Sequence, residues 1–533
     1  MNTTENEIVS KLDSIVSRAR RQTLGDVLRR SARRYPQKSC IECGDHIRWT
    51  YYEFDEACDR LAAGLLLSGL KKGMRVAVLA RNSHSFALLR FALARAGGVI
   101  VPVNFMLNPE EVAYILAHSG ARALCVDAEF ADVGRAAAQK AGCVESLWGL
   151  ENEEGESPQG INLINQLAFS ATDLSPLEGV DIAGSDVAQI IYTSGTESKP
   201  KGALLNHDGV IWEYVTCLVD TSIDVDDVLL HALPLYHCAQ LDVFLGPSIY
   251  VGGTNIITAA PASESIITKI SQRGITSFFA PPTVWISILR DPAGTREAMA
   301  SLQKGYYGAS IMPVEVLKEL LERFPNLRLW NLYGQTEIAP VATVLRPEEQ
   351  LLKAGSAGRP GLNVETRVVD DGGVDVDCGV IGEVVHRSPQ LMSGYYNDPE
   401  RTAEAYDGGW FHSGDLATID EEGYITIVDR KKDMIKSGGE NVSSREVEEV
   451  IYLLSDVSEV AVVGIPDEKW IEAVCAFVVL KAGVTTTEAK IIEHSSAHLA
   501  GFKTPKRVVL VESLPKNPSG KVLKRELRVA LAP

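Results

Sequence analysis

A short stretch of hydroxyls, glycines and lysines follows an apolar run in the middle of this 533-residue chain. Residues 188–192, Ala-Gln-Ile-Ile-Tyr, predict a buried strand. The polar residues that follow are Thr193, Ser194, Gly195, Thr196, Ser198, Lys199, Lys201 and Gly202. A polyphosphate has many acceptor oxygens and no donors, so hydroxyl, backbone N–H and ammonium groups suit it. The spacing is not that of a Walker A loop, and an ordinary polar loop after a strand is the alternative.

Residues 192–202 resemble the phosphate loop of the adenylate-forming superfamily, which includes acyl-CoA synthetases, luciferases and peptide-synthetase adenylation domains. The usual family form is Tyr-Thr-Ser-Gly-Thr-Thr-Gly-x-Pro-Lys-Gly, and here Glu197 and Ser198 replace Thr-Gly. We expect Glu197 to face solvent, because phosphate oxygens repel a carboxylate. The ATP- and AMP-binding residues that the resemblance implies in this loop are Thr193, Ser194, Gly195, Thr196, Lys199 and Lys201.

Residues 333–337, Tyr-Gly-Gln-Thr-Glu, resemble the family's Tyr-Gly-x-Thr-Glu motif. The likeness implies that Tyr333 and Gly334 lie at the adenine, that Thr336 meets the α-phosphate, and that Glu337 binds Mg²⁺. The physical chemistry agrees, because a hard cation prefers carboxylate oxygen and a phosphate needs a hydroxyl donor. Thr336 and Glu337 are therefore expected to be catalytic. A small-residue stretch resembles the family's segment beside adenine and the acyl group: Gly308, Ala309 and Ser310.

Later motifs resemble the family's ribose, hinge and CoA-tunnel sequences. Residues 410–416, Trp-Phe-His-Ser-Gly-Asp-Leu, imply that Asp415 accepts hydrogen bonds from the ribose hydroxyls. The Asp-Arg pair at 429–430 implies a ribose or phosphate contact for Arg430 and a hinge at Lys432. The next loop implies a CoA tunnel lined by Lys436, Gly438 and Gly439.

A lysine near the C-terminus completes the expected catalytic set. Residues 514–521 resemble the family's Pro-Lys-x-x-x-Gly-Lys end motif, which matches Lys521 to the catalytic lysine. A carboxylate that attacks an α-phosphate brings two anions together, and a cation offsets the charge that develops. Taken alone, Lys521 would be interpreted as a surface lysine.

The expected acyl pocket follows the sequence Pro-Leu-Tyr-His at 234–237, which resembles the family's aromatic-His motif. The likeness implies that His237, Cys238 and Leu241 line the pocket. Peptide-synthetase domains place an Asp after this motif to hold an α-ammonium group, and a cysteine is a poor ammonium ligand. An amino-acid substrate is therefore disfavoured. The apolar neighbours Phe244, Phe278, Phe279, Val284 and Trp285 suit a hydrophobic acid, although a protein core has the same composition.

The composition indicates a soluble globular protein of the cytoplasm. The formal net charge is −18, which disfavours non-specific nucleic-acid binding, and no apolar run is long enough to span a bilayer. Nine cysteines without a framework spacing suggest reduced thiols. Residues 17–34 contain seven arginines. They are interpreted either as a helix with core contacts or as a basic helix that touches anionic membranes.

Strands and helices alternate along most of the chain. Apolar runs at 76–80, 99–103 and 123–126 predict a mainly parallel, doubly wound sheet. The expected fold is α/β, with a large N-terminal domain of doubly wound sheets, a β-rich subdomain, and a small mobile α+β C-terminal domain. The expected divisions are an adenylation domain at 1–429, a hinge at 430–432 and a lid domain at 433–533.

These motifs imply a carboxylic acid–CoA ligase that uses ATP, Mg²⁺ and CoA. The acid is activated as acyl-AMP with release of pyrophosphate, and the CoA thiol then forms acyl-CoA. A medium- or long-chain fatty acid is the expected substrate. The alternatives are an aryl or steroid acid, and a carrier protein in place of free CoA as acceptor. The oligomeric state is left open between monomer and homodimer.

Overall fold

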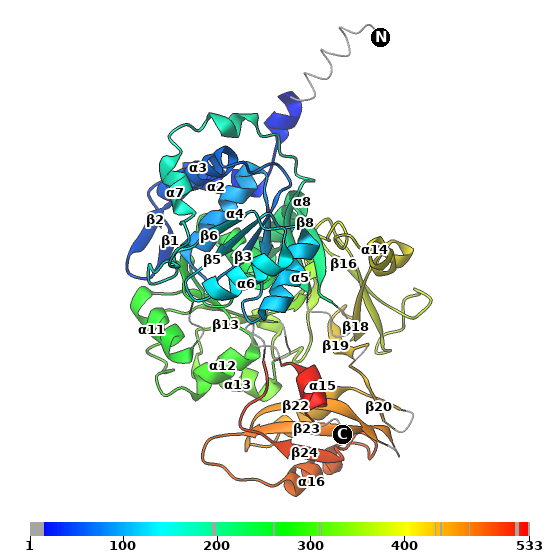
Figure 1. Cartoon of the computed structure of the whole chain (residues 1–533). Coiled ribbons are helices and arrows are strands. Elements are labelled where there is room, and N and C mark those ends of the chain that lie inside the picture. Colours follow the sequence, from blue (N-terminus) through cyan, green and yellow to red (C-terminus); the bar gives the residue numbers. More distant parts are fainter. Residues whose placement is uncertain are drawn as a thin grey trace.

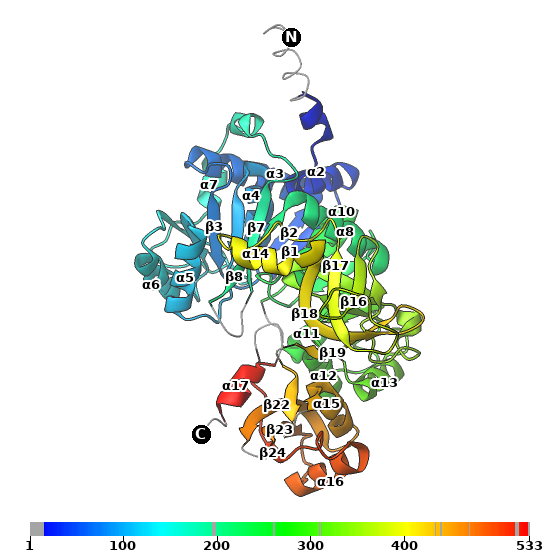
Figure 2. The same cartoon turned by 90° about the vertical axis from the view of Figure 1, so that its right-hand side faces the viewer.

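The computed structural model describes residues 15–193, 199–259, 262–308, 310, 312–431, 433–437, 440–467, 470–516 and 522–530. These residues form four β-sheets with helices packed around them (Figure 1). Two large sheets and a small antiparallel sheet lie together, and the fourth sheet lies at the end of the molecule that carries the C-terminus (Figure 2). The α/β fold class predicted from the sequence is therefore confirmed.

The six-stranded sheet contains β7, the strand that leads into the phosphate-loop sequence. Its strand order is β6-β5-β3-β4-β7-β8, and only β8 runs antiparallel to its neighbour. The strands are β3 (Arg75–Leu79), β4 (Val99–Pro102), β5 (Ala123–Val126), β6 (Ser146–Gly149), β7 (Val187–Thr193) and β8 (Lys201–Asn206). The three predicted parallel strands are confirmed. Strand β8 was not predicted, because its Lys-Gly start was interpreted only as part of a loop.

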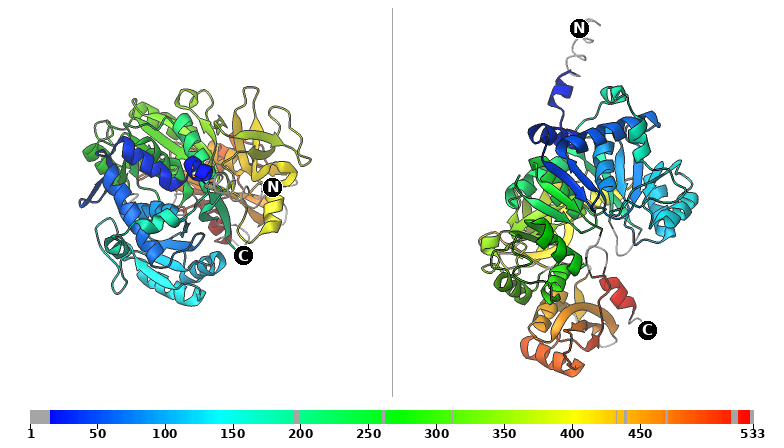
Figure 3. Two further views of the ribbon diagram at one scale, coloured as in Figure 1. Left: turned by 90° about the horizontal axis from the view of Figure 1, so that it is seen from above. Right: turned by 90° about the vertical axis from the view of Figure 1, so that its left-hand side faces the viewer.

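The nine-stranded sheet contains β13, the strand that leads into the Tyr-Gly-Gln-Thr-Glu sequence at 333–337. Its order is β15-β14-β13-β12-β11-β9-β10-β1-β2, parallel in the middle and antiparallel at both ends. The strands are β1 (Ser39–Cys43), β2 (Ile47–Thr50), β9 (Val228–His231), β10 (Thr254–Ile257), β11 (Ser277–Phe279), β12 (Lys304–Gly308), β13 (Arg328–Gly334), β14 (Val341–Leu345) and β15 (Arg359–Pro360). The two large sheets lie side by side, with helices on their outer faces (Figure 3).

Two smaller sheets complete the fold. The antiparallel four-stranded sheet contains β16 (Glu365–Val369), β17 (Gly382–Arg387), β18 (Phe411–Ile419) and β19 (Ile425–Arg430). The C-terminal five-stranded sheet contains β20 (Ile435–Ser437), β21 (Glu440–Val442), β22 (Val457–Asp467), β23 (Ile471–Leu480) and β24 (Arg507–Leu510). Strand β19 ends and β20 begins on either side of the predicted hinge, whose boundaries remain a prediction.

Several helices begin at capping residues that the sequence offers. The hydroxyl of Ser83 accepts a hydrogen bond from the Phe86 amide (3.2 Å) at the start of α4, and Asn108 forms a capping box with Glu111 at the start of α5. The helices are α2 (Leu24–Arg34), α3 (Tyr51–Leu67), α4 (His84–Ala96), α5 (Pro109–Ser119), α6 (Ala131–Ala141), α7 (Asn165–Ser170), α8 (His207–Asp220), α9 (Cys238–Gln240), α10 (Gly246–Val251), α11 (Ser263–Arg273), α12 (Pro282–Arg290), α13 (Val314–Arg323), α14 (Pro399–Ala405), α15 (Ser444–Tyr452), α16 (Glu488–His498) and α17 (Lys524–Val529).

Short helical turns join some of these elements. They are η1 (Ser175–Gly179), η2 (Leu241–Leu245), η3 (Thr336–Ile338), η4 (Pro347–Glu349) and η5 (Asp407–Gly409). The largest apolar core connects α3 and α4 with β1 and β3, strands of the two different large sheets. Its fully buried aromatic residues include Tyr51, Phe54, Phe86 and Phe91. Burial of these side chains removes apolar surface from water and fixes the two sheets against each other.

The arginine-rich start of the chain packs against the core through α2. Leu24, Val27 and Leu28 are buried, and the capping box at Thr23 starts the helix. Several arginines have partners within the protein: Arg21 pairs with Asp26 at 2.7 Å, and Arg29 with Asp59 at 2.5 Å. Helix α2 therefore has the core contacts that the first interpretation of this segment predicts. Contact with a membrane remains a prediction.

No helix among the described residues is long and apolar enough to cross a lipid bilayer.

Candidate active site

Strands β7 and β8 bring two residues of the phosphate-loop motif together. Thr193 and Lys201 are cross-strand partners in the antiparallel pairing of β7 with β8. Lys201 is half-buried and Lys199 is exposed. The predicted ligands Ser194, Gly195 and Thr196 lie outside the described residues, as does Glu197. The structure therefore places the two ends of the motif at the end of a hairpin.

A second group of predicted residues meets at the ends of β13, β18 and β19. The Tyr333 hydroxyl donates a hydrogen bond to Oδ2 of Asp415 (2.7 Å), and Nε of Arg430 lies 3.3 Å from the other carboxylate oxygen. Asp415 and Arg430 are also cross-strand partners. Burial, and the neighbouring Asp415 carboxylate, raise the pKa of Tyr333 well above its usual range, so the phenol remains a donor. Three residues from distant motifs thus form one cluster.

The turn η3 carries the predicted phosphate and metal residues. Thr336 and Glu337 are both buried. The Thr336 hydroxyl lies 3.4 Å from the Cys238 thiol, a contact between the phosphate side and the predicted acyl pocket. Oε1 of Glu337 accepts a hydrogen bond of 2.8 Å from the Tyr395 hydroxyl. The predicted phosphate residue Thr336 is therefore in direct contact with the predicted acyl-pocket residue Cys238.

Close backbone approach explains the glycine at the start of this turn. A Cβ atom at Gly334 would lie 1.8 Å from the carbonyl oxygen of Pro340, so no other residue fits without a shift of the backbone. A Cβ at Gly308, at the end of β12, would lie 2.4 Å from the Leu332 carbonyl oxygen. Of the rest of that motif, Ser310 is exposed and Ala309 lies outside the described residues.

Two buried polar side chains, Gln390 and Glu213, hold the segment that follows η3. Neither residue belongs to a motif identified in the sequence. Nε2 of Gln390 contacts the carbonyl oxygens of Ile338 (3.0 Å) and Val341 (2.6 Å). It also contacts Oε2 of Glu213 at 2.6 Å, while Oε1 of Glu213 accepts from the Val341 amide at 3.0 Å. Burial raises the pKa of Glu213 well above its usual range. The four residues fix the position of the turn that carries Thr336 and Glu337.

The predicted acyl-pocket residues lie in an apolar, aromatic region. Cys238 and Leu241 are fully buried, and Nδ1 of His237 accepts the Ala239 amide (3.2 Å) at the start of α9. Phe244 stacks on Phe279 with ring centroids 4.6 Å apart. These residues come from β11 and from the segment formed by α9 and η2. In the sequence, only their apolar character connects them. The structure packs Phe244 and Phe279 in one apolar cluster with Ala239, the residue after Cys238, whereas Leu241 packs in the core around α3 and α4.

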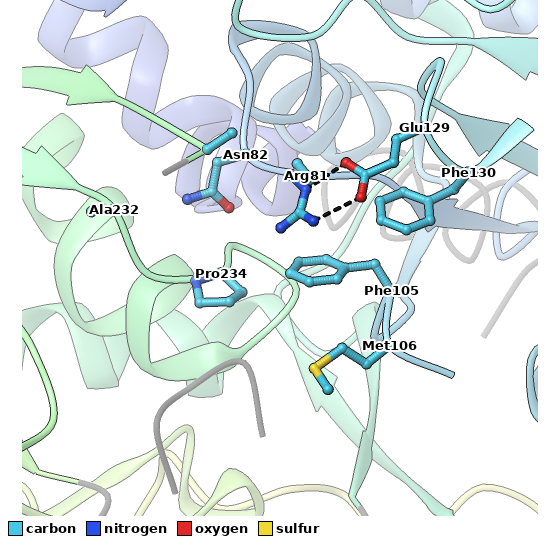
Figure 4. A pocket seen from close by; sticks show the side chains of 9 residues that line it. Arg81, Asn82, Phe105, Met106, Glu129, Phe130, Ala232 and Pro234 are labelled. Carbon is cyan, nitrogen blue, oxygen red and sulfur yellow. Dashed lines mark hydrogen bonds and ion pairs between the residues drawn. The ribbon is translucent and has the colours of Figure 1, made fainter. Parts of the chain in front are cut away.

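A pocket of about 360 Å³ lies where strands of both large sheets end (Figure 4). Nε and Nη2 of Arg81 donate to Glu129 at 2.6 and 2.7 Å, and the guanidinium lies 4.7 Å from the ring centroid of Phe105. The Asn82 side chain donates to the Leu233 carbonyl (2.7 Å) and so joins the two sheets. The lining residues are Arg81, Asn82, Phe105, Met106, Glu129, Phe130, Ala232, Pro234 and Ala259.

None of the predicted acyl-pocket residues lines this pocket, and its lining was missed in the sequence. A signal was present, because Arg81, Phe105 and Glu129 each follow a predicted strand. The carboxyl ends of parallel strands share one edge of a sheet, where ligands bind in open α/β folds. Phe105 meets Tyr236 edge-to-face, with ring centroids 5.2 Å apart. The pocket therefore adjoins the aromatic-His motif.

The remaining predicted residues belong to the hinge and the C-terminal part. Lys436 is an exposed residue of β20, and its amide donates to Oε2 of Glu472 at 2.7 Å. The hinge residue Lys432, the tunnel residues Gly438 and Gly439, and the catalytic Lys521 lie outside the described residues. Their assigned roles remain predictions.

Glu337 fits the Mg²⁺ role that the resemblance implies. Its carboxylate is a hard oxygen donor, and among the described residues Oε2 has no hydrogen-bond partner and no cation pairs with it. The described residues contain no group of three His, Cys, Asp or Glu side chains that could hold a metal by themselves. Mg²⁺ is commonly bound through one or two carboxylates together with substrate phosphates, so a single carboxylate beside a phosphate site suits it.

Comparison with known proteins shows the family to which this chain belongs. The family model for AMP-binding enzymes matches residues 28–396, and that for the AMP-binding enzyme C-terminal domain matches residues 446–521. This chain belongs to the AMP-binding enzyme family. It is an AMP-forming acid–CoA ligase, for which ATP, CoA and a small carboxylic acid are substrates.

Similar curated proteins differ in the acid that their names give. A feruloyl-CoA synthase of Amycolatopsis is 36% identical over 509 residues, which cover 96% of this chain and 99% of that protein. The long-chain-fatty-acid–CoA ligase FadD13 of Mycobacterium tuberculosis is 35% identical over 511 residues, covering 95% of this chain and 98% of FadD13. The names of these relatives therefore do not assign the acid substrate of this chain to one chemical class.

Solved structures support the arrangement of this AMP-binding enzyme. ATP-bound MatB from Rhodopseudomonas palustris superposes with a TM-score of 0.86 at 29% identity, covering 96% of this chain and 99% of MatB. The apo form of the same protein gives a TM-score of 0.76 at the same coverage. The chain thus superposes better on the ATP-bound structure.

Proposed function

We propose that this ligase activates a carboxylic acid with an apolar carbon skeleton, and that a medium- or long-chain fatty acid is its substrate. The observation that carries the proposal is the apolar character of the segment that begins at Cys238, whose thiol lies 3.4 Å from the Thr336 hydroxyl. Cys238, Leu241, Phe244 and Phe279 are each at most 5% exposed. The one carboxylate in that segment, Asp242, is turned toward Arg90 at 3.1 Å and so away from this region. An apolar chain placed there gains free energy from burial.

The roles of the site residues follow from the groups they present. In the proposal, Asp415 accepts the ribose hydroxyls, and Tyr333 and Arg430 orient its carboxylate. Lys201 and the Thr336 hydroxyl bind phosphate oxygens. The acid's carboxylate lies beside Thr336 and attacks the α-phosphate, which forms acyl-AMP and releases pyrophosphate. Positioning and electrostatic stabilisation supply most of the rate enhancement in such a transfer.

Charge neutralisation completes the first step. A bound Mg²⁺ offsets the negative charge of the phosphates when present. Glu337 would hold that ion through its free oxygen, and Lys521 would bridge the two reacting anions. Lys521 then withdraws, and the CoA thiol attacks the acyl-AMP carbonyl, which forms the thioester bond, releases AMP and frees the thiol proton. Exclusion of water between the two steps protects the mixed anhydride from hydrolysis.

The pocket beside Phe105 and Pro234 is proposed to admit the pantetheine arm of CoA. The charge of Arg81 is already paired with Glu129, so the pocket presents a largely uncharged surface. Phe105, Phe130 and Met106 supply an apolar wall that suits a slender, neutral chain. The pocket adjoins the aromatic-His motif, next to the residues proposed to hold the acid.

An aryl acid is the second candidate. The relative named feruloyl-CoA synthase is 36% identical to this chain. The stacked rings of Phe244 and Phe279 offer a flat aromatic surface, and aromatic pairs gain about 0.5–1.5 kcal/mol beyond burial. An aromatic acid would therefore find specific partners in the same region.

An acid-panel assay tests the proposal. Pyrophosphate release and thioester formation are measured with ATP, Mg²⁺ and CoA, using acetate, octanoate, palmitate and ferulate as the acids. We expect kcat/KM to rise by about fourfold for each buried CH₂ group, from acetate toward octanoate. A strong preference for ferulate would select the aryl candidate, and acid-independent pyrophosphate release would reject both. A parallel reaction with a phosphopantetheinylated carrier protein in place of CoA tests the alternative acceptor.

A further inference from the structure

Tyr395 lies between two predicted site residues and is absent from every motif described above. Its hydroxyl donates a hydrogen bond of 2.8 Å to Oε1 of Glu337. The ammonium of Lys201 lies 4.8 Å from the centroid of its ring, over the aromatic face. The residue is buried. One side chain thus touches the candidate metal ligand with its polar end and the candidate phosphate ligand with its ring.

The backbone around Tyr395 connects the same two elements. The Met392 amide donates to the Glu337 carbonyl at 2.8 Å. The Ser393 amide donates to the Leu204 carbonyl at 2.8 Å, and the Tyr396 amide donates to the Gly202 carbonyl at 2.8 Å. Residues 392–396, which we term the bridging segment, therefore bind η3 and run along β8. The position of Tyr395 is fixed by this backbone pairing and not by a mobile loop.

A phenol is well suited to orient a carboxylate that must also bind a cation. It occupies one oxygen of Glu337 and leaves the other available, as no described residue donates to Oε2. A phenol has a pKa of about 10 in water, so it is a neutral hydrogen-bond donor at pH 7. A neutral donor orients the carboxylate without cancelling its charge, whereas a lysine or arginine in its place would compete with the ion.

The Tyr395 ring positions the Lys201 ammonium without neutralising its charge. Among the described residues no carboxylate pairs with this lysine, and the Tyr395 ring face is the partner of its ammonium. A cation–π contact contributes about 0.5–2 kcal/mol, and it leaves the full positive charge of the ammonium for a phosphate. A carboxylate in place of the ring would weaken the attraction between Lys201 and phosphate, because the carboxylate and the phosphate are both negative and repel each other.

We propose that Tyr395 is a positioning residue, which holds the Glu337 carboxylate for a divalent cation and the Lys201 ammonium for phosphate. The proposal rests on the proposed function, in which these two residues meet the metal ion and ATP. In this proposal Tyr395 contacts neither the cation nor ATP. Its hydroxyl acts on the metal and its ring acts on the phosphate, so the two roles can be separated by substitution.

Binding measurements separate the hydroxyl from the ring. In Tyr395→Phe the ring remains and the hydrogen bond to Glu337 is lost. Loss of such an outer hydrogen bond commonly weakens metal affinity by about 10- to 100-fold, so we expect the Kd for ATP in the presence of Mg²⁺ to rise by about tenfold. The Kd for ATP in EDTA should change by less than about twofold, because no metal is involved. Isothermal titration calorimetry gives both constants without turnover.

Two further variants serve as comparisons. In Tyr395→Leu the ring is lost as well, so ATP affinity in EDTA should also fall. Tyr406→Phe is the matched control, because the Tyr406 hydroxyl donates to the Met392 carbonyl (2.5 Å) in the same bridging segment and touches neither site residue. It should leave the ratio of the two constants unchanged. Thermal unfolding of each variant sets a measuring temperature at which the protein is folded.

The outcomes distinguish this proposal from the function on which it rests. Equal loss of affinity with and without Mg²⁺ in Tyr395→Phe would overturn the positioning role, as would no loss at all. In a Glu337→Gln background the Tyr395→Phe change should have no further effect on the Mg²⁺-dependent constant, since its target is gone. Wild-type protein that binds no ATP under either condition would instead reject the proposed function.

Discussion

Asp415 is the residue whose surroundings most directly favour a ribose site. Tyr333 donates to one of its oxygens at 2.7 Å, and Arg430 lies 3.3 Å from the other. Both neighbours are donors, so they orient the two carboxylate oxygens. An ionised carboxylate can accept from two hydroxyls at once, which matches the 2′- and 3′-hydroxyls of a ribose.

Replacement of this carboxylate gives a prediction at the residue scale. In Asp415→Asn an amide NH₂ replaces one acceptor oxygen, so at least one hydroxyl or neighbouring donor loses its partner. Hydrogen bonds to charged groups contribute about 1.5–3 kcal/mol, which corresponds to a rise of about 10- to 100-fold in the Kd for ATP. Calorimetric titration of ATP measures this rise.

An exposed aspartate provides the control for that substitution. Asp371 pairs with Lys431 at 3.0 Å, and its side chain is 94% exposed. An exposed ion pair contributes little, so Asp371→Asn should leave ATP affinity within about twofold of the wild type. Similar losses in both variants would show that Asp415 acts through general charge and has no specific contact with the nucleotide.

At the scale of elements, the turn η3 depends on α8 and on residues between β17 and β18. Glu213 on α8 and Gln390 before the bridging segment contact Ile338 and Val341, on either side of the turn's exit. A turn with short flanking contacts has few ways to shift, so Thr336 and Glu337 are held in place before any ligand arrives. Such preorganisation lowers the entropy cost of binding.

The raised pKa of Glu213 predicts different outcomes for two substitutions. A neutral carboxylic acid can be replaced by an amide of the same shape, so Glu213→Gln should cost at most about 1.5 kcal/mol in the free energy of unfolding. Glu213→Ala leaves the Val341 amide without an acceptor and creates a cavity, and it should cost about 3–5 kcal/mol. Urea unfolding at pH 7 measures both values. A Gln variant as unstable as the Ala variant would indicate that Glu213 is ionised in the folded protein.

At the scale of the whole molecule, α15 attaches the C-terminal part to the rest. The Ser444 amide donates to Asp429 at 2.9 Å, and Arg445 donates to the Gly355 carbonyl at 2.6 Å. Lys524, three residues after Lys521, pairs with Glu448 of α15 at 2.8 Å within the C-terminal part. The polar contacts of Ser444 and Arg445 can exchange with water at modest cost, which suits the domain movement that we propose.

The two half-reactions test the predicted role of Lys521. Lys521→Ala should slow formation of acyl-AMP by about 100-fold or more, because the transition-state charge loses its cation. Thioester formation from supplied acyl-AMP should be nearly unchanged, because that step needs no charge bridge at the α-phosphate. Pyrophosphate release and CoA thioester formation are followed in separate assays.

A nearby lysine serves as the matched control. Lys516 lies in the same C-terminal motif and pairs with Glu459 at 2.6 Å within that part of the chain. Lys516→Ala should leave the ratio of the two half-reaction rates unchanged. Equal slowing of both steps in Lys521→Ala would contradict a role confined to adenylation.

The sequence by itself determined the fold class, several of the strands and the candidate groups for nucleotide binding, because these depend on local patterns. Apolar runs of four to seven residues between capping residues specify strands and helices wherever they occur. The motif that contains Tyr333 and the one that contains Asp415 could each be found from residue types alone. Their direct hydrogen bond could not, since it joins residues 82 positions apart.

Tertiary structure alone decided which side chains support the site. Tyr395, Gln390 and Glu213 are a phenol, an amide and a carboxylate in otherwise ordinary segments, and no spacing marks them. They act only because β8, η3 and α8 pack so that their polar atoms come within 3.0 Å of the site segments. Partners for buried polar groups are set by packing between elements, which local sequence does not specify.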